Sequence, residues 1–359
     1  MKLCIIDPHS IKNKFKLDEN SLELGLGGTE TWDIQFSRHL AILGNEVFLS
    51  VFCNTHKDKY GVNWISLDDL KTTLLNNHFE AILIIRYFKG IINLIEQNNI
   101  TDKVFIQATQ TSFEDYCARP ILYESCKEFQ SNIIKKFFYL SEFNKKTLMN
   151  LNHIPEEKLD YLPVGIDIDL FKNISIDNNV DHRILMASSN RGIMQMIPTI
   201  LNLVKKEIPD FGFDIASPAY DNYAVRNSIS PDIKFFGHLS KTRLYEEFSK
   251  HACWIYPSIF PETFCLVSVE AAMCGNELIL PLINGPATTF KPFQHSIGMK
   301  NKFYSPEAFY ECSKRIVKSM KNYHNKENVF LRKQIREYIS NNFSINILSK
   351  KFLDYINSI

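Results

Sequence analysis

The sequence predicts an α/β protein with two successive domains, each built around a mostly parallel sheet. Three observations favour this class. The chain has 359 residues, which is too long for one ordinary core and fits two domains of roughly 150 to 200 residues each. Short apolar runs alternate with segments long enough for helices, as in strands joined by crossover helices. This alternation occurs twice, before and after a polar stretch, so we expect a second domain of the same kind.

The first series of elements is assigned to residues 1–170 and has the rhythm of a Rossmann-like domain. An apolar run at residues 2–7 and a glycine-rich segment precede a helical stripe of residues spaced three and four apart, namely Trp32, Phe36, Leu40 and Leu43. Gly44 stands where the C′ glycine of that helix belongs. Further strands are predicted at residues 46–52, 81–85, 104–108, 137–141 and 160–164.

The second series is assigned to residues 181–340. It follows the polar segment 165–183, which has no clear periodicity and is the predicted linker. Its strands are predicted at residues 183–188, 213–217, 233–238, 253–258 and 277–282. Beyond about residue 306 we expect helices only. The last helix, within residues 341–359, is expected to be amphipathic and docked, because apolar residues recur at helical spacing: Leu348, Phe352, Tyr355, Ile356 and Ile359.

Composition argues against several classes of function. The formal net charge is +1, so the sequence gives no support for a nucleic-acid partner. The eight cysteines are scattered, with no CxxC pair and no zinc-site spacing, which predicts reduced thiols in a cytoplasmic protein and no metal cluster. The first ten residues do not read as a signal peptide. No apolar run approaches the roughly 20 residues that span a bilayer.

Residues 260–275, with the sequence FPETFCLVSVEAAMCG, carry two carboxylates in an otherwise apolar or small segment. The pattern predicts a helix over residues 263–274 with Gly275 as its stop. Helix geometry would put Glu262 and Glu270 roughly 12 Å apart along the axis and only about 80° apart around it. Both carboxylates could then touch one extended ligand.

The start of this helix would lie between the two acids. The first-turn N–H groups of Phe264, Cys265 and Leu266 would have no intrahelical acceptor, and the helix dipole makes such an end attractive to phosphate. An anion flanked by two hydrogen-bond acceptors suits a nucleotide diphosphate sugar, with ribose hydroxyls on one acid and sugar hydroxyls on the other. The alternative is that Glu262 is a first-turn acid favoured by the dipole and that Glu270 lies on a solvated face.

Residues 251–275 resemble the donor-site segment of retaining glycosyltransferases of family 4, which have the GT-B fold. The residues that match are Pro257, Ser258, Glu262, Phe264, Leu266, Glu270, Ala271 and Gly275. Segments 24–47, 139–171 and 233–258 resemble other parts of that family in the same order. The resemblance implies two Rossmann-like domains facing each other across a cleft, with a C-terminal helix that packs back on the first domain.

The resemblance also implies roles for individual residues. Arg191 would clamp the departing diphosphate as a catalytic residue, a task that suits the forked guanidinium. The backbone near His238 would lie beside the nucleobase, and Glu262 would be the second catalytic residue. The donor site would be formed by Gly27, Gly28, Arg191, His238, Glu262, Thr263, Phe264, Cys265, Leu266 and Glu270.

Each role has a plainer alternative. The glycines could form an ordinary strand-to-helix turn, and Arg191 could be a surface residue. A dinucleotide fingerprint is weakened, because Glu30 stands where the third glycine of that motif belongs. Family members also carry a histidine near the end of a strand in the first domain. This chain has none there, which leaves Gln107, Thr109 and Gln110 as neutral substitutes.

The function implied by the resemblance is that of a hexosyltransferase. It would move a sugar from a nucleotide diphosphate sugar to a carbohydrate or lipid-linked acceptor, with retention of configuration and without a metal or cofactor. The missing histidine keeps two alternatives open: another GT-B enzyme such as a sugar-nucleotide epimerase, and a non-catalytic sugar-binding module. The basic pairs 135–136 and 145–146 could contact an anionic membrane, or they could belong to a solvated helix face.

Overall fold

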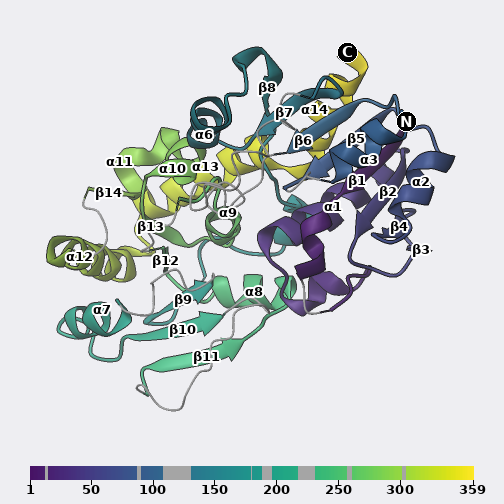
Figure 1. The fold of residues 1–359 in the computed structure, drawn as a ribbon. Coiled ribbons are helices and arrows are strands. Elements are labelled where there is room, and N and C mark those ends of the chain that lie inside the picture. Colours follow the sequence, from purple (N-terminus) through teal and green to yellow (C-terminus); the bar gives the residue numbers. More distant parts are fainter. Residues whose placement is uncertain are drawn as a thin grey trace.

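The computed structural model contains one large sheet and two smaller ones (Figure 1). It describes residues 1–12, 15–86, 90–107, 131–178, 180–187, 196–216, 231–256, 261–300 and 305–359. The large sheet has the order β3-β4-β2-β1-β5-β6-β7-β8, and its pairs are parallel except for β3 with β4. Its strands are β1 (Lys2–Ile6), β2 (Glu46–Val51), β3 (His56–Lys57), β4 (Asn63–Ser66), β5 (Ala81–Ile85), β6 (Val104–Gln107), β7 (Ile134–Tyr139) and β8 (Leu159–Tyr161).

Helices cover both faces of the large sheet, which is why its central strands are apolar on both sides. Successive residues of β1 alternate between two cores: Leu3 and Ile5 belong to one, and Cys4 and Ile6 belong to the other. The described helices of this part of the chain are α1 (Gly28–Ile42), α2 (Leu70–Asn76), α3 (Ile91–Gln97) and α6 (Glu142–Asn152).

The two smaller sheets have the orders β11-β10-β9 and β12-β13-β14, and β9 lies beside β12. Their strands are β9 (Arg183–Ala187), β10 (Gly212–Ala216), β11 (Ile233–Gly237), β12 (Cys253–Ile255), β13 (Glu277–Pro281) and β14 (Gly298–Met299). The helices are α7 (Ile197–Val204), α8 (Lys241–Phe248), α9 (Leu266–Met273), α10 (Asn284–Thr289), α11 (Gln294–Ile297), α12 (Pro306–Asn322), α13 (Lys326–Phe343) and α14 (Ile345–Ser358).

Every strand predicted from the sequence exists, with ends that shift by a few residues. The predicted helix with its C′ glycine is confirmed as α1, after which Gly44 takes a φ of +87°. The prediction for Leu43 was wrong, because this residue follows the end of α1 and is 37% exposed. Two strands of the large sheet, β3 and β4, were not predicted. The segment around Trp64 is only four residues long, and a run of that length carries little periodicity.

The C-terminal helix α14 packs on the large sheet and on α1, as expected. The ring of Phe352 lies 5.6 Å from that of Phe36 and 5.9 Å from that of Phe138. Tyr355 meets Phe138 edge to face at 5.3 Å. The prediction for Ile359 was wrong, because this residue lies beyond the last helical turn and is 50% exposed.

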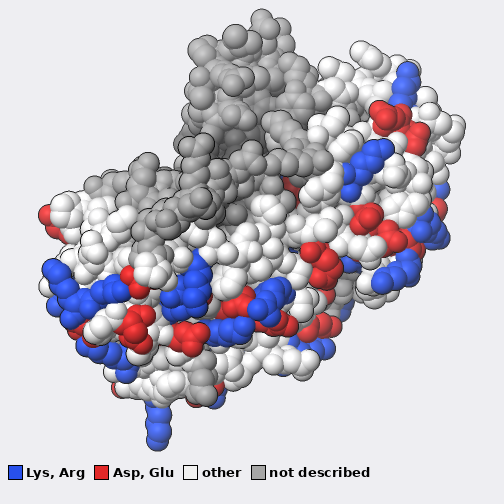
Figure 2. All heavy atoms as spheres, turned by 90° about the horizontal axis from the view of Figure 1, so that it is seen from below, with Lys and Arg blue, Asp and Glu red and all other residues white. Residues whose placement is uncertain are grey.

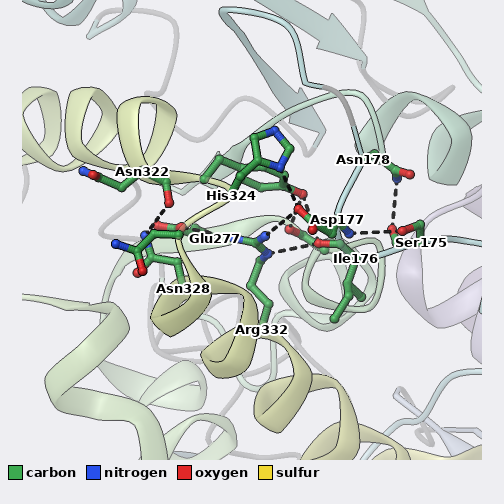
Figure 3. Close-up of polar contacts among 12 residues, drawn as sticks. Ser175, Ile176, Asp177, Asn178, Glu277, Asn322, His324, Asn328 and Arg332 are labelled. Carbon is green, nitrogen blue, oxygen red and sulfur yellow. Dashed lines mark hydrogen bonds and ion pairs between the residues drawn. The ribbon is translucent and has the colours of Figure 1, made fainter.

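The segment that links the sheets is held by α13 (Figure 3). The buried Arg332 donates from Nε to the carbonyl of Ile176 at 3.1 Å and from Nη1 to Oε1 of Glu277 at 3.3 Å. One turn later, Arg336 donates to the carbonyl of Ile174 at 2.7 Å. Because two of these three acceptors are backbone carbonyls of the linker, hydrogen bonds from α13 fix its path.

The described surface in Figure 2 carries basic and acidic side chains in alternation. One member of the predicted basic pairs, Lys145, forms an ion pair with Glu156 at 2.6 Å and lies over the ring of Tyr139. Lys136 donates to the carbonyl of Glu157. Contact of these pairs with a membrane remains a prediction.

Among the described residues, no helix combines the length and the apolar character that crossing a membrane requires.

Candidate active site

The segment after β12 leads to α9, but the helix begins later than predicted. It starts at Leu266 rather than at residue 263, because Cys265 adopts a left-handed conformation with a φ of +72° that an α-helix does not accommodate. Thr263 and Phe264 therefore precede the helix, and its unpaired first-turn amides begin at Leu266. The helical spacing expected between Glu262 and Glu270 does not apply, since residues 262–265 are not helical.

Gly285 in α10 holds this non-helical segment in place, and sequence reasoning missed it. Its N–H donates to the carbonyl of Glu262 at 2.7 Å. A Cβ on Gly285 would lie 2.3 Å from the carbonyl carbon of Thr263, so no side chain fits at this position. Phe264 is fixed from the other side by the edge of Phe343, with ring centroids 5.2 Å apart. The only sequence signal was the Asn-Gly-Pro run, which equally predicts a simple turn.

Glu262 is buried, with 8% of its surface exposed. The hydroxyl of Tyr256, the residue after β12, donates to its Oε1 at 2.6 Å. Tyr256 in turn stacks on Trp254, with the two rings 5.4 Å apart and only 9° from parallel. The carboxylate is therefore oriented from the carboxyl end of a strand, where α/β sheets bind their ligands.

Glu270 is more deeply buried, at 2% exposure, so the alternative of a solvated helix face is wrong for this residue. Its Oε1 accepts hydrogen bonds from Nζ of Lys241 at 2.6 Å and from the hydroxyl of Tyr245 at 2.8 Å. Both donors belong to α8, where residues four apart share one face. These contacts explain how a carboxylate is tolerated inside an apolar run.

The glycine-rich loop of the first half ends at α1. Gly27 is the N-cap residue and Gly28 is the first helical residue, so no side chain caps the helix there. Neither glycine is among those with a positive φ, whereas Gly25 has a φ of +70°. The carbonyl of Gly27 accepts hydrogen bonds from the N–H and the hydroxyl of Thr31, at 3.0 and 2.8 Å. The start of this 15-residue helix can attract an anion.

The two halves of the molecule meet beside this loop. A Cβ on Gly25 would lie 2.8 Å from the carbonyl oxygen of Leu239 and 3.3 Å from Cβ of His238. Only glycine therefore fits between the loop and the segment that follows β11. The structure thus brings His238 close to the loop that contains Gly27 and Gly28, and the role of these residues in binding a donor remains a prediction.

A cluster of charged side chains lies behind the start of α1. Arg86, at the end of β5, donates from Nη2 to Oε1 of Glu30 at 2.7 Å and from Nε to Oδ1 of Asp7 at 3.1 Å. Asp33, one turn after Glu30, is fully buried, and neither of its carboxyl oxygens receives a hydrogen bond within the described residues. Burial, and next the nearby Asp7 carboxylate, raise the pKa of Asp33 well above its ordinary value.

Some of the predicted residues lie outside the described ranges, among them Arg191, Pro257, Ser258, Thr109 and Gln110. Gln107 is described, and it is no substitute for a ligand-binding histidine. Its side chain is buried, accepts from the indole of Trp32 at 2.8 Å and donates to the carbonyl of Leu162 at 2.9 Å. Both ends of the amide are thus used inside the core.

No group of three or more His, Cys, Asp or Glu side chains is arranged to hold a metal ion within the described parts of the chain. The six cysteines in those parts are buried.

Comparison with known proteins supports the fold. No family model matches the chain. No curated protein sequence matches it. Among solved structures, a glycosyltransferase from Rickettsia africae aligns with a TM-score of 0.71 and 17% identity, over 99% of this chain and 97% of that one. Sucrose-phosphate synthase from Thermosynechococcus elongatus aligns with a TM-score of 0.69 and 14% identity, over 99% and 98%.

A third similar structure is that of HepE from Anabaena, solved with UDP and glucose. It aligns with a TM-score of 0.67 and 14% identity over the full length of both chains. Likeness over whole chains at such low identity establishes the architecture rather than the chemistry. The chain has the GT-B fold.

Proposed function

We propose that this protein is a glycosyltransferase that moves a sugar from a nucleotide diphosphate sugar to a carbohydrate or lipid-linked acceptor, with retention of configuration, as in family 4. The observation that carries the proposal is the pair of buried acids after β12. Glu262 is oriented by the Tyr256 hydroxyl, and Glu270 is held by Lys241 and Tyr245. Buried carboxylates with fixed donors are suited to bind hydroxyl groups of a ligand that has two polar rings.

The negative charge of a diphosphate would be met by two helix starts. One is α9, which begins at Leu266, and the other is α1, which begins at Gly28. Arg191 would supply the cation. In this arrangement the amides and the guanidinium stabilise the charge that develops on the departing diphosphate, which is the main demand of sugar transfer from such a donor.

The solved structures with a similar fold support uridine diphosphate sugars as the first donors to test. The Anabaena protein was solved with UDP and glucose, and a similar structure from E. coli was solved with UDP-2-fluoro glucose. The metal independence expected from the sequence is part of the proposal, and transfer in the presence and absence of EDTA tests it.

Binding of the donor is tested by thermal shift with UDP-, GDP- and ADP-glucose. We expect one donor to raise the melting temperature of the wild type, and we expect Glu270→Gln and Arg191→Ala to reduce that shift. Glu246→Gln is the matched control, because Glu246 is an exposed acid that pairs with Arg243 on the outer surface of α8. If no donor shifts the wild type, the assignment of the donor site fails.

Transfer itself is tested by release of free nucleotide in the presence of an acceptor panel. Release that depends on an acceptor supports transfer, whereas conversion of the donor sugar without an acceptor identifies an epimerase. Binding of the donor without either reaction identifies a non-catalytic sugar-binding module.

A further inference from the structure

We propose that Lys241 and Tyr245 are positioning residues, which fix the Glu270 carboxylate so that its second oxygen receives the ribose hydroxyls of the donor. This inference rests on the proposed function and deepens it. The first observation is that both hydrogen bonds go to the same oxygen, Oε1. No described residue donates to Oε2.

A carboxylate has about four lone-pair positions on its two oxygens, and here two donors occupy one oxygen. The carboxylate plane is then defined by Lys241 and Tyr245, which leaves Oε2 in a fixed place as a bare acceptor. A ribose offers two neighbouring hydroxyl donors, a group that such an oxygen can bind. An acid held by two partners would not have to reorganise when the ligand arrives.

The position of Lys241 indicates that the contact has a purpose other than helix stability. Lys241 is the first residue of α8, directly after the N-cap Ser240. A cation in the first turn opposes the helix dipole, and a lysine that is only 8% exposed is unusual. The ion pair with Glu270 at 2.6 Å offsets both costs.

Tyr245 lies one helical turn further along α8 and is packed from behind by Phe171, with ring centroids 4.4 Å apart. Burial, and next the Glu270 carboxylate, raise the pKa of the Tyr245 hydroxyl well above its ordinary value. The phenol therefore keeps its proton and acts as a hydrogen-bond donor to Oε1 at any physiological pH.

Helix α8 also connects Glu270 with the contact between the two halves. The residues just before it, His238 and Leu239, are those against which Gly25 packs. The nucleobase is expected beside the same segment. The short helix α8 would therefore position both the Glu270 carboxylate, which accepts from the ribose, and the segment that lies beside the nucleobase.

The test is isothermal titration of the full chain with UDP, GDP and ADP and with their 2′,3′-dideoxy forms. The measured quantity is the ratio of dissociation constants for the dideoxy and the natural nucleotide. In the wild type we expect a ratio of about 10 to 100, since hydrogen bonds to a charged group are lost. Tyr245→Phe should lower this ratio at least threefold. Lys241→Arg, which keeps the cation, should lower it less than Lys241→Met.

Tyr256→Phe is the matched control, because it removes a tyrosine hydroxyl that donates to Glu262 instead of to Glu270. Its ratio should equal that of the wild type even if overall affinity falls. If Lys241→Met does not fold, the ratio of dissociation constants measured with Tyr245→Phe tests the inference alone. Equal ratios in Tyr245→Phe and wild type would overturn the inference while leaving donor binding intact. Absence of binding to all three natural nucleotides would overturn the proposed function as well.

Discussion

Two buried acids, Glu270 in α9 and Asp33 in α1, show how differently the two halves of the molecule treat a carboxyl group. Both are nearly or fully inaccessible. Glu270 accepts hydrogen bonds from Lys241 and Tyr245. Asp33 receives none from the described residues, and the nearby Arg86 is already engaged by Asp7 and Glu30. The charge of one acid is balanced, and that of the other is not.

The consequence is a difference in chemical use. An unbalanced buried carboxylate is costly, and burial raises the pKa of Asp33 well above its ordinary value, which favours the protonated form. Glu270, with a lysine as counter-ion, is available as an acceptor for a ligand. Burial alone therefore does not identify a functional acid, and Glu270 differs from Asp33 in having a dedicated cation, Lys241.

The largest expected effect is on stability and follows from Lys241→Met. Removing the ammonium leaves the Glu270 carboxylate buried without a cation, and breaking such a pair costs about 3 to 5 kcal/mol. Urea denaturation followed by the fluorescence of tryptophan, with Trp254 in the neighbouring strand β12 as a reporter, measures this loss.

The double variant Lys241→Met, Glu270→Gln is the control for the first prediction. It removes the charge that Lys241 balances, so it should recover more than half of the lost stability. If the single and the double variant are equally unstable, the cost lies in packing of the lysine stem rather than in the charge.

A smaller and pH-dependent effect is expected from Asp33→Asn. Because the pKa of Asp33 is raised in the folded state, the folded protein binds a proton that the unfolded chain releases above about pH 4. The stability of the wild type relative to the variant should therefore be greatest at low pH. It should fall by about 1.4 kcal/mol per pH unit until the raised pKa is passed. Denaturation at a series of pH values from 4 upward gives this difference.

A difference between wild type and Asp33→Asn that does not vary with pH would show that Asp33 is ionised in the folded protein. The two buried acids would then be alike, and the contrast between the two halves would fail. Glu30→Gln serves as the comparison variant, since Glu30 already has Arg86 as a partner.

The sequence predicted the strands, the α1 stripe and the position of the two acids after β12, because each depends on residues close together in the chain. It did not predict the start of α9. The residues just before the left-handed Cys265 are held by Gly285 and Phe343, which lie 20 and 78 residues after Cys265 in the chain. Nothing in the local pattern distinguishes such a residue from the first turn of a helix.

The partners of Glu270 were also beyond prediction, although one signal was present. A lysine directly after a serine N-cap is an unfavourable first residue for a helix, which could have marked Lys241 as a residue with another task. The partner, 29 residues away, becomes visible only in the fold. Nothing in the sequence indicates that Asp33 is buried. Polar residues of α1 are buried beside apolar ones such as Trp32, so the apolar pattern does not show which polar residues are exposed.

The smallest expected effect concerns the end of α8 that presents Lys241. The hydroxyl of Ser240 accepts the N–H of Arg243 at 3.2 Å and caps this helix. Ser240→Ala should cost about 1 kcal/mol, whereas Ser240→Gly should cost only a few tenths, because glycine leaves the terminal N–H groups open to water. If the cap also maintains the geometry at Glu270, Ser240→Ala should lower the ratio of dissociation constants for the dideoxy and the natural nucleotide, as Tyr245→Phe does, but by a smaller factor. A ratio unchanged in Ser240→Ala, despite the loss of stability, would show that Lys241 and Tyr245 hold the carboxylate independently of how their helix begins.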